Sequence, residues 1–141
     1  MDSAPPVALS LVIPVYNEKD AVAETLVRAC SVIEQSGISA EIIVVDDGSD
    51  DGTGDVLKNF GSSVQIVRHP VNRGYGAAIK TGLRHAQGEW IAITDADGTY
   101  PLEKLPELWN LTQDAEMVVG MRPRSAQPMI RRPAKWFLAR L

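Results

Sequence analysis

Short apolar runs rich in valine and isoleucine alternate with helix-forming stretches along most of this chain, and that alternation constrains the fold more than any other feature. Most of the runs lack the polar alternation of a half-exposed strand, so we expect helices on both faces of a sheet. The expected strands span residues 8–14, 41–45, 64–68, 90–94 and 116–121. Strands that alternate with helices predict an α/β fold, a three-layer sandwich around a mostly parallel sheet.

The stretches between the strands predict the helices. Residues 18–35 carry apolar side chains at helical spacing, and Asn17 is expected to cap the start of this helix. Shorter helices are expected at residues 53–60, 76–86 and 102–111. The 141 residues fit one domain with a core of its own, and prolines after residue 121 interrupt regular structure there.

Charge is distributed unevenly along the sequence. Residues 1–120 hold all 18 acidic residues and 8 of the 14 basic ones, whereas residues 121–141 hold the other basic residues and no acid. The basic residues of this tail are Arg122, Arg124, Arg131, Arg132, Lys135 and Arg140. A basic tail on an acidic body predicts contact with an anionic surface, and a solvated chain end is the plainer alternative. No feature of the chain indicates a nucleic-acid partner.

The tail also carries apolar residues among its cations. From Pro133 onward we expect a short helix in which Trp136 and Phe137 lie at a membrane interface while the cations contact anionic lipid. A core helix whose partner lies elsewhere is the alternative. No stretch reaches the roughly 18 apolar residues of a membrane span, no signal peptide is evident, and Cys30 is a lone cysteine. We therefore expect a cytoplasmic protein at the cytosolic face of a membrane.

Polar, glycine-rich segments follow four of the expected strands. They span residues 14–18, 46–53, 69–76 and 95–101. The carboxyl ends of parallel strands meet at one edge of a sheet, and ligands of such folds bind there. The four loops are therefore predicted to form one site.

Asp95 and Asp97 follow an apolar strand two residues apart, so their carboxylates can face one point. Two unpaired carboxylates repel each other, and a bound cation relieves that repulsion. Hard oxygen ligands suit Mg²⁺ or Mn²⁺, which also bind phosphate oxygens. The pair therefore predicts a divalent metal site, with ordinary turn formation as the alternative.

The acidic loop at residues 46–53 has several interpretations. With Asp47 as the first position of a calcium loop, Lys58 would occupy the place of the bidentate acid, so that interpretation fails. An Asp at the end of a strand can instead accept hydrogen bonds from a base or ribose, while Gly48 and Gly52 allow tight turns. An ordinary Asp/Gly turn is the remaining alternative.

Residues 72–76 (NRGYG) lead into a helix that carries Lys80 one turn inside. Glycine permits close backbone approach and a helix N-terminus favours anions, so this segment is expected to lie near phosphate. The segment follows the third strand and lacks dinucleotide-binding spacing, which argues against a nicotinamide-dependent dehydrogenase. His69 and His85 are isolated in the sequence and are expected at the surface or at helix caps.

Four blocks of the sequence together resemble an inverting glycosyltransferase of family 2, with the GT-A fold. The blocks are residues 12–18 (VIPVYNE), 45–53 (VDDGSDDGT), 72–83 (NRGYGAAIKTGL) and 95–101 (DADGTYP). Within family 2 they are most similar to polyprenyl- or dolichyl-phosphate sugar synthases. The resemblance implies a Rossmann-like nucleotide-sugar-binding domain at residues 1–121 and a lipid-phosphate acceptor.

The resemblance also implies roles for particular residues. The nucleotide sugar would contact Pro14, Tyr16, Glu18, Val45, Asp46, Asp47, Lys80, Asp95 and Ala96. Asp95 and Asp97 would hold Mg²⁺ or Mn²⁺ on the donor diphosphate, and Arg122 matches a family arginine that approaches phosphate. Relatives often carry Gln two residues after the second metal-binding Asp, and here Thr99 stands there as the candidate third ligand.

Relatives continue well beyond the length of this sequence, so the chain is expected to be a fragment in which residues 122–141 lead into a membrane-interface helix. The expected reaction is inverting transfer from a UDP- or GDP-linked sugar to polyprenyl or dolichyl phosphate. A phosphate monoester is mostly dianionic at neutral pH and needs no general base, and the tail arginines could hold it. The sequence leaves the oligomeric state open.

Two other functions fit parts of the sequence. The fragment could bind a nucleotide sugar without enough of the acceptor site to turn it over. Asp95, Asp97, Gly98 and Thr99 also match the first motif of haloacid-dehalogenase-type phosphatases. Those enzymes, however, carry the motif on the first strand and need a later pair of Lys and acid. Metal-dependent binding without turnover would favour the binding module, and phosphate release from a generic monoester would favour the phosphatase.

Overall fold

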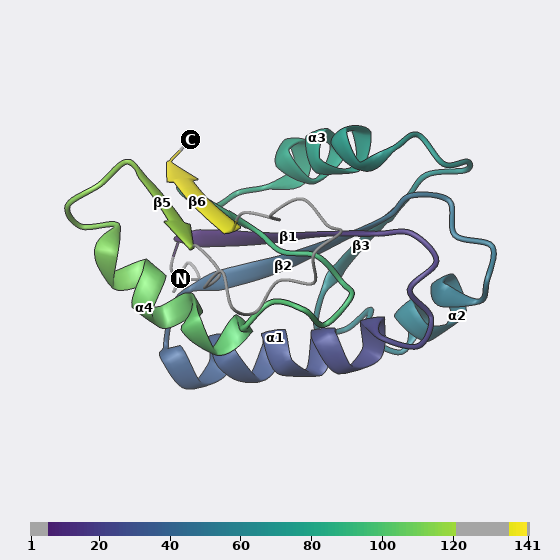
Figure 1. The fold of residues 1–141 in the computed structure, drawn as a ribbon, viewed down its shortest axis with the longest axis horizontal. Coiled ribbons are helices and arrows are strands. Elements are labelled where there is room, and N and C mark those ends of the chain that lie inside the picture. Colours follow the sequence, from purple (N-terminus) through teal and green to yellow (C-terminus); the bar gives the residue numbers. More distant parts are fainter. Residues whose placement is uncertain (1–5, 121–135, 141) are drawn as a thin grey trace, which may run out of the picture.

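A six-stranded sheet with helices on both faces forms the protein in the computed structural model, which describes residues 6–120 and 136–140 (Figure 1). The strands are β1 (Leu9–Val15), β2 (Ala40–Asp46), β3 (Gln65–Arg68), β4 (Trp90–Ile93), β5 (Met117–Gly120) and β6 (Trp136–Arg140). The helices are α1 (Val22–Ser36), α2 (Thr53–Lys58), α3 (Tyr75–His85), the 3₁₀ helix η1 (Leu102–Lys104) and α4 (Leu105–Leu111).

The strand order in the sheet is β3-β2-β1-β4-β6-β5. The first four strands in that order are parallel, and β6 runs antiparallel to both of its neighbours. The predicted α/β sandwich with a mostly parallel sheet is confirmed. The carboxyl ends of β1, β2 and β4 consequently lie along one edge of the sheet.

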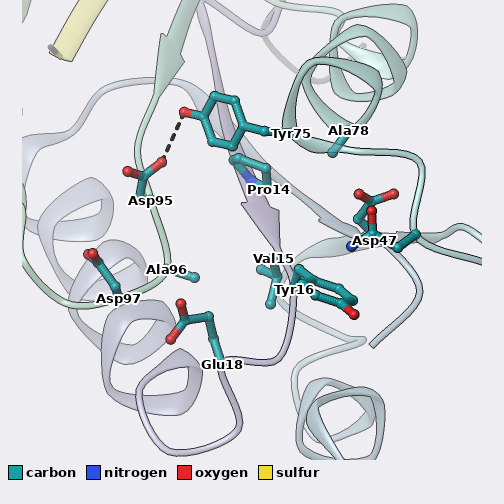
Figure 2. Close-up of a pocket in the computed structure, with 11 residues that line it drawn as sticks. Pro14, Val15, Tyr16, Glu18, Asp47, Tyr75, Ala78, Asp95, Ala96 and Asp97 are labelled. Carbon is teal, nitrogen blue, oxygen red and sulfur yellow. Dashed lines mark hydrogen bonds between the residues drawn. The ribbon is translucent and has the colours of Figure 1, made fainter. Parts of the chain in front are cut away.

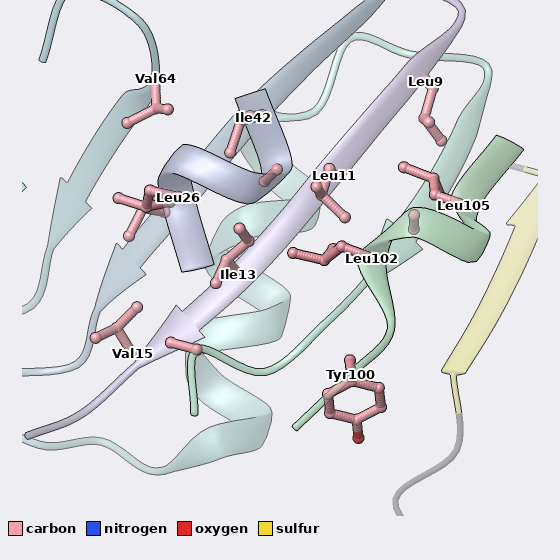
Figure 3. Packing of buried hydrophobic residues seen from close by; sticks show 14 of the residues in the cluster. Leu9, Leu11, Ile13, Val15, Leu26, Ile42, Val64, Tyr100, Leu102 and Leu105 are labelled. Atoms are coloured by element: carbon pink, nitrogen blue, oxygen red, sulfur yellow. The ribbon is translucent and has the colours of Figure 1, made fainter. Parts of the chain in front are cut away.

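Strand β1 lies at the centre of the sheet, and all seven of its residues are buried. On one face, Leu11 and Ile13 pack in a core to which Leu26 of α1 and Leu102 of η1 also belong (Figure 3). On the other face, Val12 packs with residues of β4 and α3. Because helices cover both faces, the apolar run that forms β1 carries no polar alternation.

Helix α1 begins at Val22, whereas the apolar spacing predicts a start at residue 18. The residue at its N-cap is Ala21 and not Asn17. Asn17 adopts a left-handed φ of 53°, which a short polar side chain tolerates. Its Nδ2 donates to Asp50 Oδ1 at 3.0 Å, and its Oδ1 accepts from Asp50 N at 3.0 Å. The prediction of an N-cap at Asn17 is therefore wrong, and the residue instead ties the loop after β1 to the loop after β2.

The basic tail forms a strand, not a helix, over the part that the structure describes. Strand β6 inserts between β4 and β5, and Leu138 is fully buried opposite Ala92 and Val118. The prediction of an interface helix from Pro133 onward is thus wrong for residues 136–140. An open edge of β4 would leave backbone donors and acceptors unpaired, and a segment rich in aromatic and aliphatic residues satisfies them as a strand.

One cation of the tail is already used inside the fold. Arg140 Nη2 lies 2.6 Å from Glu89 Oε1, so the last turn before β4 and the end of β6 form an ion pair. The tail cations at residues 122–135, Arg122 among them, lie outside the described residues. Among residues 6–120 and 136–140, no helix has the length and hydropathy that crossing a bilayer requires.

Gly82 of α3 supplies a test of how closely this helix packs on the sheet. A Cβ atom on Gly82 would overlap Val12 Cγ1, whereas a Cβ on Gly76 of the same helix would meet nothing within 4 Å. We expect Gly82→Ala to lower the free energy of unfolding by about 1–3 kcal/mol through overpacking. Gly76→Ala should be neutral or stabilising by up to roughly 1 kcal/mol, as alanine is in helices generally. Urea unfolding of both variants measures the difference, and equal effects would contradict the close approach.

Candidate functional site

A pocket of about 310 Å³ opens where β1, β2 and β4 end and α3 begins (Figure 2). The pocket is lined by Pro14, Val15, Tyr16, Glu18, Asp47, Asn72, Tyr75, Ala78, Asp95, Ala96 and Asp97. Except for Ala78 of α3, these residues come from the four loops that the sequence places at one sheet edge. Carboxylates line two sides of the pocket, with Asp47 on one side and Asp95 and Asp97 across from it (Figure 2).

The structure brings most of the predicted site residues together but not all of them. The predicted residues that line the pocket are Pro14, Tyr16, Glu18, Asp47, Asp95, Ala96 and Asp97. Val45 is fully buried and packs with Ala78 beneath α3, and Lys80 is exposed on α3 outside the pocket lining. Thr99 also lies outside that lining, and Arg122 lies outside the described residues.

Asp47 is nearly fully buried, with 3% of its surface exposed, and its carboxylate is heavily hydrogen-bonded. Oδ1 accepts from His69 Nδ1 at 2.6 Å and from Arg73 N at 2.9 Å, and Oδ2 accepts from Gly74 N at 2.7 Å. Burial alone would raise the pKa of Asp47, but these hydrogen bonds outweigh it and hold the pKa below its usual value. Asp47 is therefore an ionised group that fixes the loop before α3 and also faces the pocket.

His69 is buried beside Asp47, so the predicted surface or capping role is wrong for this histidine. Its Nδ1 donates to Asp47, and its Nε2 lies 2.9 Å from Thr81 Oγ1 of α3. The nitrogen that faces the carboxylate carries a proton, which leaves Nε2 to accept from the threonine hydroxyl in the neutral ring. His85, in contrast, donates from Nδ1 to Thr81 O at 2.9 Å in the last turn of α3, as a capping residue does.

Asp46 points to the opposite face of the sheet from Asp47, because successive strand residues alternate. Its Oδ1 accepts from Ser49 N at 2.9 Å, and its Oδ2 lies 3.4 Å from Arg68 Nε. The turn from Asp46 to Ser49 also needs Gly48, because its φ is 76° and a Cβ added to it would overlap the backbone of Val71. Asp46 thus shapes the turn from behind the pocket rather than lining it.

Hydroxyl groups donate to the carboxylates of Asp95 and Asp97, which lie across the pocket from Asp47. Tyr75 Oη donates to Asp95 Oδ1 at 2.9 Å, and Thr99 donates to Asp97 Oδ1 from Oγ1 at 2.6 Å and from N at 3.0 Å. Partial burial raises the pKa of Tyr75, and the charge of Asp95 raises it further, so the phenol stays a donor. A carboxylate has about four acceptor positions, which leaves each of these two acids able to bind a cation as well.

Helix α1 holds the loop that carries these two acids. Thr25 Oγ1 donates to Ala96 O at 3.0 Å in a buried contact. Arg28 donates to Gly98 O at 3.4 Å and to Tyr100 O at 3.2 Å, and its Nη2 lies 2.9 Å from Glu103 Oε1. The guanidinium lowers the pKa of Glu103, so the pair stays ionised at neutral pH. The acidic loop is therefore fixed along its backbone and leaves its carboxylates facing the pocket.

Negative charge accumulates at this side of the pocket. Partial burial raises the pKa of Glu18, and the charges of Asp97, Asp51 and Asp95 raise it further. Among the residues that the structure describes, no group of three acids, histidines or cysteines could hold a metal ion by itself. A cation held by Asp95 and Asp97 would thus complete its coordination with ligand oxygens or water, which is how Mg²⁺ binds in phosphate sites.

The sequence model of the family described as glycosyl transferase family 2 matches residues 10–136, which is most of the sequence. This chain belongs to glycosyl transferase family 2. An undecaprenyl-phosphate 4-deoxy-4-formamido-L-arabinose transferase from Edwardsiella ictaluri (strain 93-146) is 36% identical to this chain over 116 residues. That match covers 79% of this chain and 36% of the relative, so the chain spans little more than a third of that relative's length.

Solved structures of glycosyltransferases show the same GT-A fold. A mannosyltransferase from Pyrobaculum calidifontis, in complex with GDP-Man and Mn²⁺, aligns with a TM-score of 0.68 and 28% identity over 86% of this chain and 37% of that one. A glucosyl-3-phosphoglycerate synthase from Mycobacterium tuberculosis, in complex with Mn²⁺, UDP and phosphoglyceric acid, aligns with a TM-score of 0.61 and 25% identity. That alignment covers 77% of this chain and 40% of the other.

The lowered pKa of Asp47 predicts how the stability of the domain depends on pH. A carboxyl whose folded pKa lies below its unfolded value stabilises the fold above the unfolded value, about 3.9, and loses that contribution as the pH falls through the folded pKa. Asp47→Asn is expected to lower the free energy of unfolding at pH 7 by roughly 1–3 kcal/mol, because buried N–H donors lose their partner. The difference from the wild type should shrink below about pH 4.

Urea unfolding at pH 7 and at decreasing pH measures this difference. Asp114→Asn is the matched control, since Asp114 is an exposed acid in the loop before β5. A loss of stability in Asp47→Asn that stays constant down to acid pH would show that the ionised carboxylate is not what holds the loop.

Proposed function

We propose that this chain is the nucleotide-sugar-binding part of an inverting, metal-assisted glycosyltransferase whose acceptor is a polyprenyl-type lipid phosphate. The observation that carries the proposal is that Asp47, Asp95 and Asp97 line one pocket, with Asp47 across from the other two at the carboxyl ends of the strands. One side offers an acceptor for a base, and the other offers carboxylates for a metal-bound diphosphate. Family membership supports the same function.

The two sides of the pocket suit the two ends of a nucleotide-sugar donor. Pro14, Tyr16 and Asp47 would contact the nucleoside, and the loop at residues 95–97 would lie at the diphosphate. Asp95 and Asp97 provide the hard oxygen ligands that Mg²⁺ and Mn²⁺ prefer, and so the donor set fits a divalent cation. Bound there, the cation would supply Lewis-acid stabilisation of the leaving nucleoside diphosphate.

Charge at the pocket supports the need for a cation. The acids that raise the pKa of Glu18 would also repel a diphosphate, which carries negative charge of its own. Two glycosyltransferases of known structure that share this fold were solved with Mn²⁺. The role of Thr99 as a third metal ligand stays a prediction, since its hydroxyl here supports Asp97.

The acceptor assignment is supported by the relatives and by acid–base chemistry. Relatives that share 36% identity are named as transferases acting on undecaprenyl phosphate. A phosphate monoester attacks as a dianion, so the protein needs to align it and offset its charge rather than deprotonate it. We propose that Arg122 and the other tail cations at residues 122–135 do this at the cytosolic face of a membrane. Those residues lie outside the described residues, so their role stays a prediction, whereas Arg140 pairs with Glu89.

A non-catalytic binding module is the second candidate function. The pocket offers groups for both ends of a donor, yet the chain spans only 36% of the length of the relative from Edwardsiella ictaluri. A phosphatase of the haloacid dehalogenase type does not fit, because Asp95 follows β4 rather than the first strand and the chain belongs to family 2. Transfer of labelled sugar to a polyprenyl phosphate by this chain would decide for the enzyme over the binding module.

Asp97→Ala tests the metal side of the pocket. Calorimetric titration with UDP and with GDP, each with Mn²⁺, should show an affinity at least about tenfold weaker for the variant, a loss of roughly 1.4 kcal/mol. The variant should stay folded, with a melting temperature equal to or above that of the wild type, because a charge that repels Glu18 is removed. Asp114→Ala, an exposed acid in the loop before β5, is the matched control. Unchanged affinity in folded Asp97→Ala would refute the metal assignment.

A further inference from the structure

The carboxylate of Asp47 has little acceptor capacity left for a ligand. A carboxylate offers about four acceptor positions, two on each oxygen. Oδ1 already accepts from His69 Nδ1 and Arg73 N, and Oδ2 accepts from Gly74 N. Asp47 nevertheless lines the pocket, so what it can still offer to a base is one acceptor position, on Oδ2.

The three donors that occupy Asp47 cannot easily be displaced. Two of them are backbone N–H groups in the turn that starts α3, where Gly74 precedes the first helical residue. The third is a buried histidine whose other nitrogen is held by Thr81 of α3. A ligand that took a position on Oδ1 would leave His69 or the backbone N–H of Arg73 without its acceptor, which is costly for the buried histidine.

The bases of nucleotide sugars differ in what they ask of a carboxylate. Guanine presents two adjacent donors, N1–H and the N2 amino group, and a carboxylate that reads it must accept one on each oxygen. Uracil and thymine present one ring donor, N3–H, between two carbonyl groups. Cytosine presents an acceptor at N3 beside a donor, the N4 amino group, so a carboxylate that accepts from N4 also faces the N3 lone pair, which has like polarity.

We infer that this pocket selects a pyrimidine with a single ring N–H, uracil or thymine, over guanine, and that the selection comes from the number of acceptor positions left on Asp47. The inference rests on the nucleotide binding proposed above. It identifies the donor class as a UDP- or dTDP-linked sugar, and His69 as the residue that sets the selection by occupying Oδ1.

Titration of the purified chain with four nucleoside diphosphates, each with Mn²⁺, tests the inference. UDP should bind about ten- to a hundredfold more tightly than GDP, which is the discrimination expected when a buried polar group is left unpaired. CDP is the matched control, because it has the size of UDP but carries an acceptor in place of the ring N–H, and it should bind more weakly than UDP. dTDP keeps the ring N–H but has a 5-methyl group and a deoxyribose, and it should also bind more tightly than GDP and CDP.

Variants of His69 test the acceptor count itself. His69→Ala removes a donor from Oδ1, so that each oxygen of Asp47 then has one free acceptor position, and the preference for UDP over GDP should narrow. His69→Asn is the matched control, because its amide N–H lies near the place of the ring Nδ1–H and should preserve the preference. Thermal unfolding of both variants verifies that they are folded, and the comparison of nucleotides in the wild type needs no variant.

The outcomes separate the inference from the function on which it rests. GDP binding as tightly as UDP would overturn the base selection and leave the nucleotide-binding function standing. CDP binding as tightly as UDP would overturn the selection of the ring N–H, because the N4 amino group of cytosine or the size of the base would then account for the binding. Failure of all four nucleotides to bind with Mn²⁺ would overturn the proposed function itself.

Discussion

The buried Asp47 carboxylate is the interaction on which the rest of the site depends. It joins the end of β2 to the turn that starts α3 and, through His69 and Thr81, to the body of that helix. Without it, the buried His69 would lose the acceptor of its Nδ1–H, and an unpaired buried donor costs more than an ordinary hydrogen bond gains. One ionised group therefore fixes both the wall of the pocket and the polarity that the pocket presents.

The opposite wall is built on a different principle. Thr25 and Arg28 of α1 hold the backbone carbonyl groups of the acidic loop, and neither bonds the carboxylates of Asp95 or Asp97. Backbone support places these acids without neutralising them, so their repulsion persists and would be relieved by the cation proposed to bind there. Rigid support with unbalanced charge is what preorganised electrostatic sites require.

Sequence reasoning located the pocket because parallel strands end at one edge, and that rule places Asp47 and Asp95 together without coordinates. It could not tell which of the neighbouring acids Asp46 and Asp47 lines the pocket, because both are aspartates at the end of the same strand. Side chains alternate along a strand, so only one of the two, Asp47, faces the pocket. His69 was missed because its partners Asp47 and Thr81 are 22 and 12 residues away. The strand β6 was mistaken for a helix because its conformation depends on the open edge of β4 rather than on its own composition.

The place of β6 in the sheet affects how the domain can be made. Strand β4, which leads into Asp95, pairs with β1 on one side and with β6 on the other, and β6 ends at Arg140. During synthesis, β1, β2 and β3 can pair as soon as they have been made. The edge of β4 that pairs with β6 stays unpaired until about forty further residues have been synthesised. Bare strand edges are sites of intermolecular pairing. The half of the sheet that carries the acidic loop is therefore the half most exposed to aggregation during synthesis.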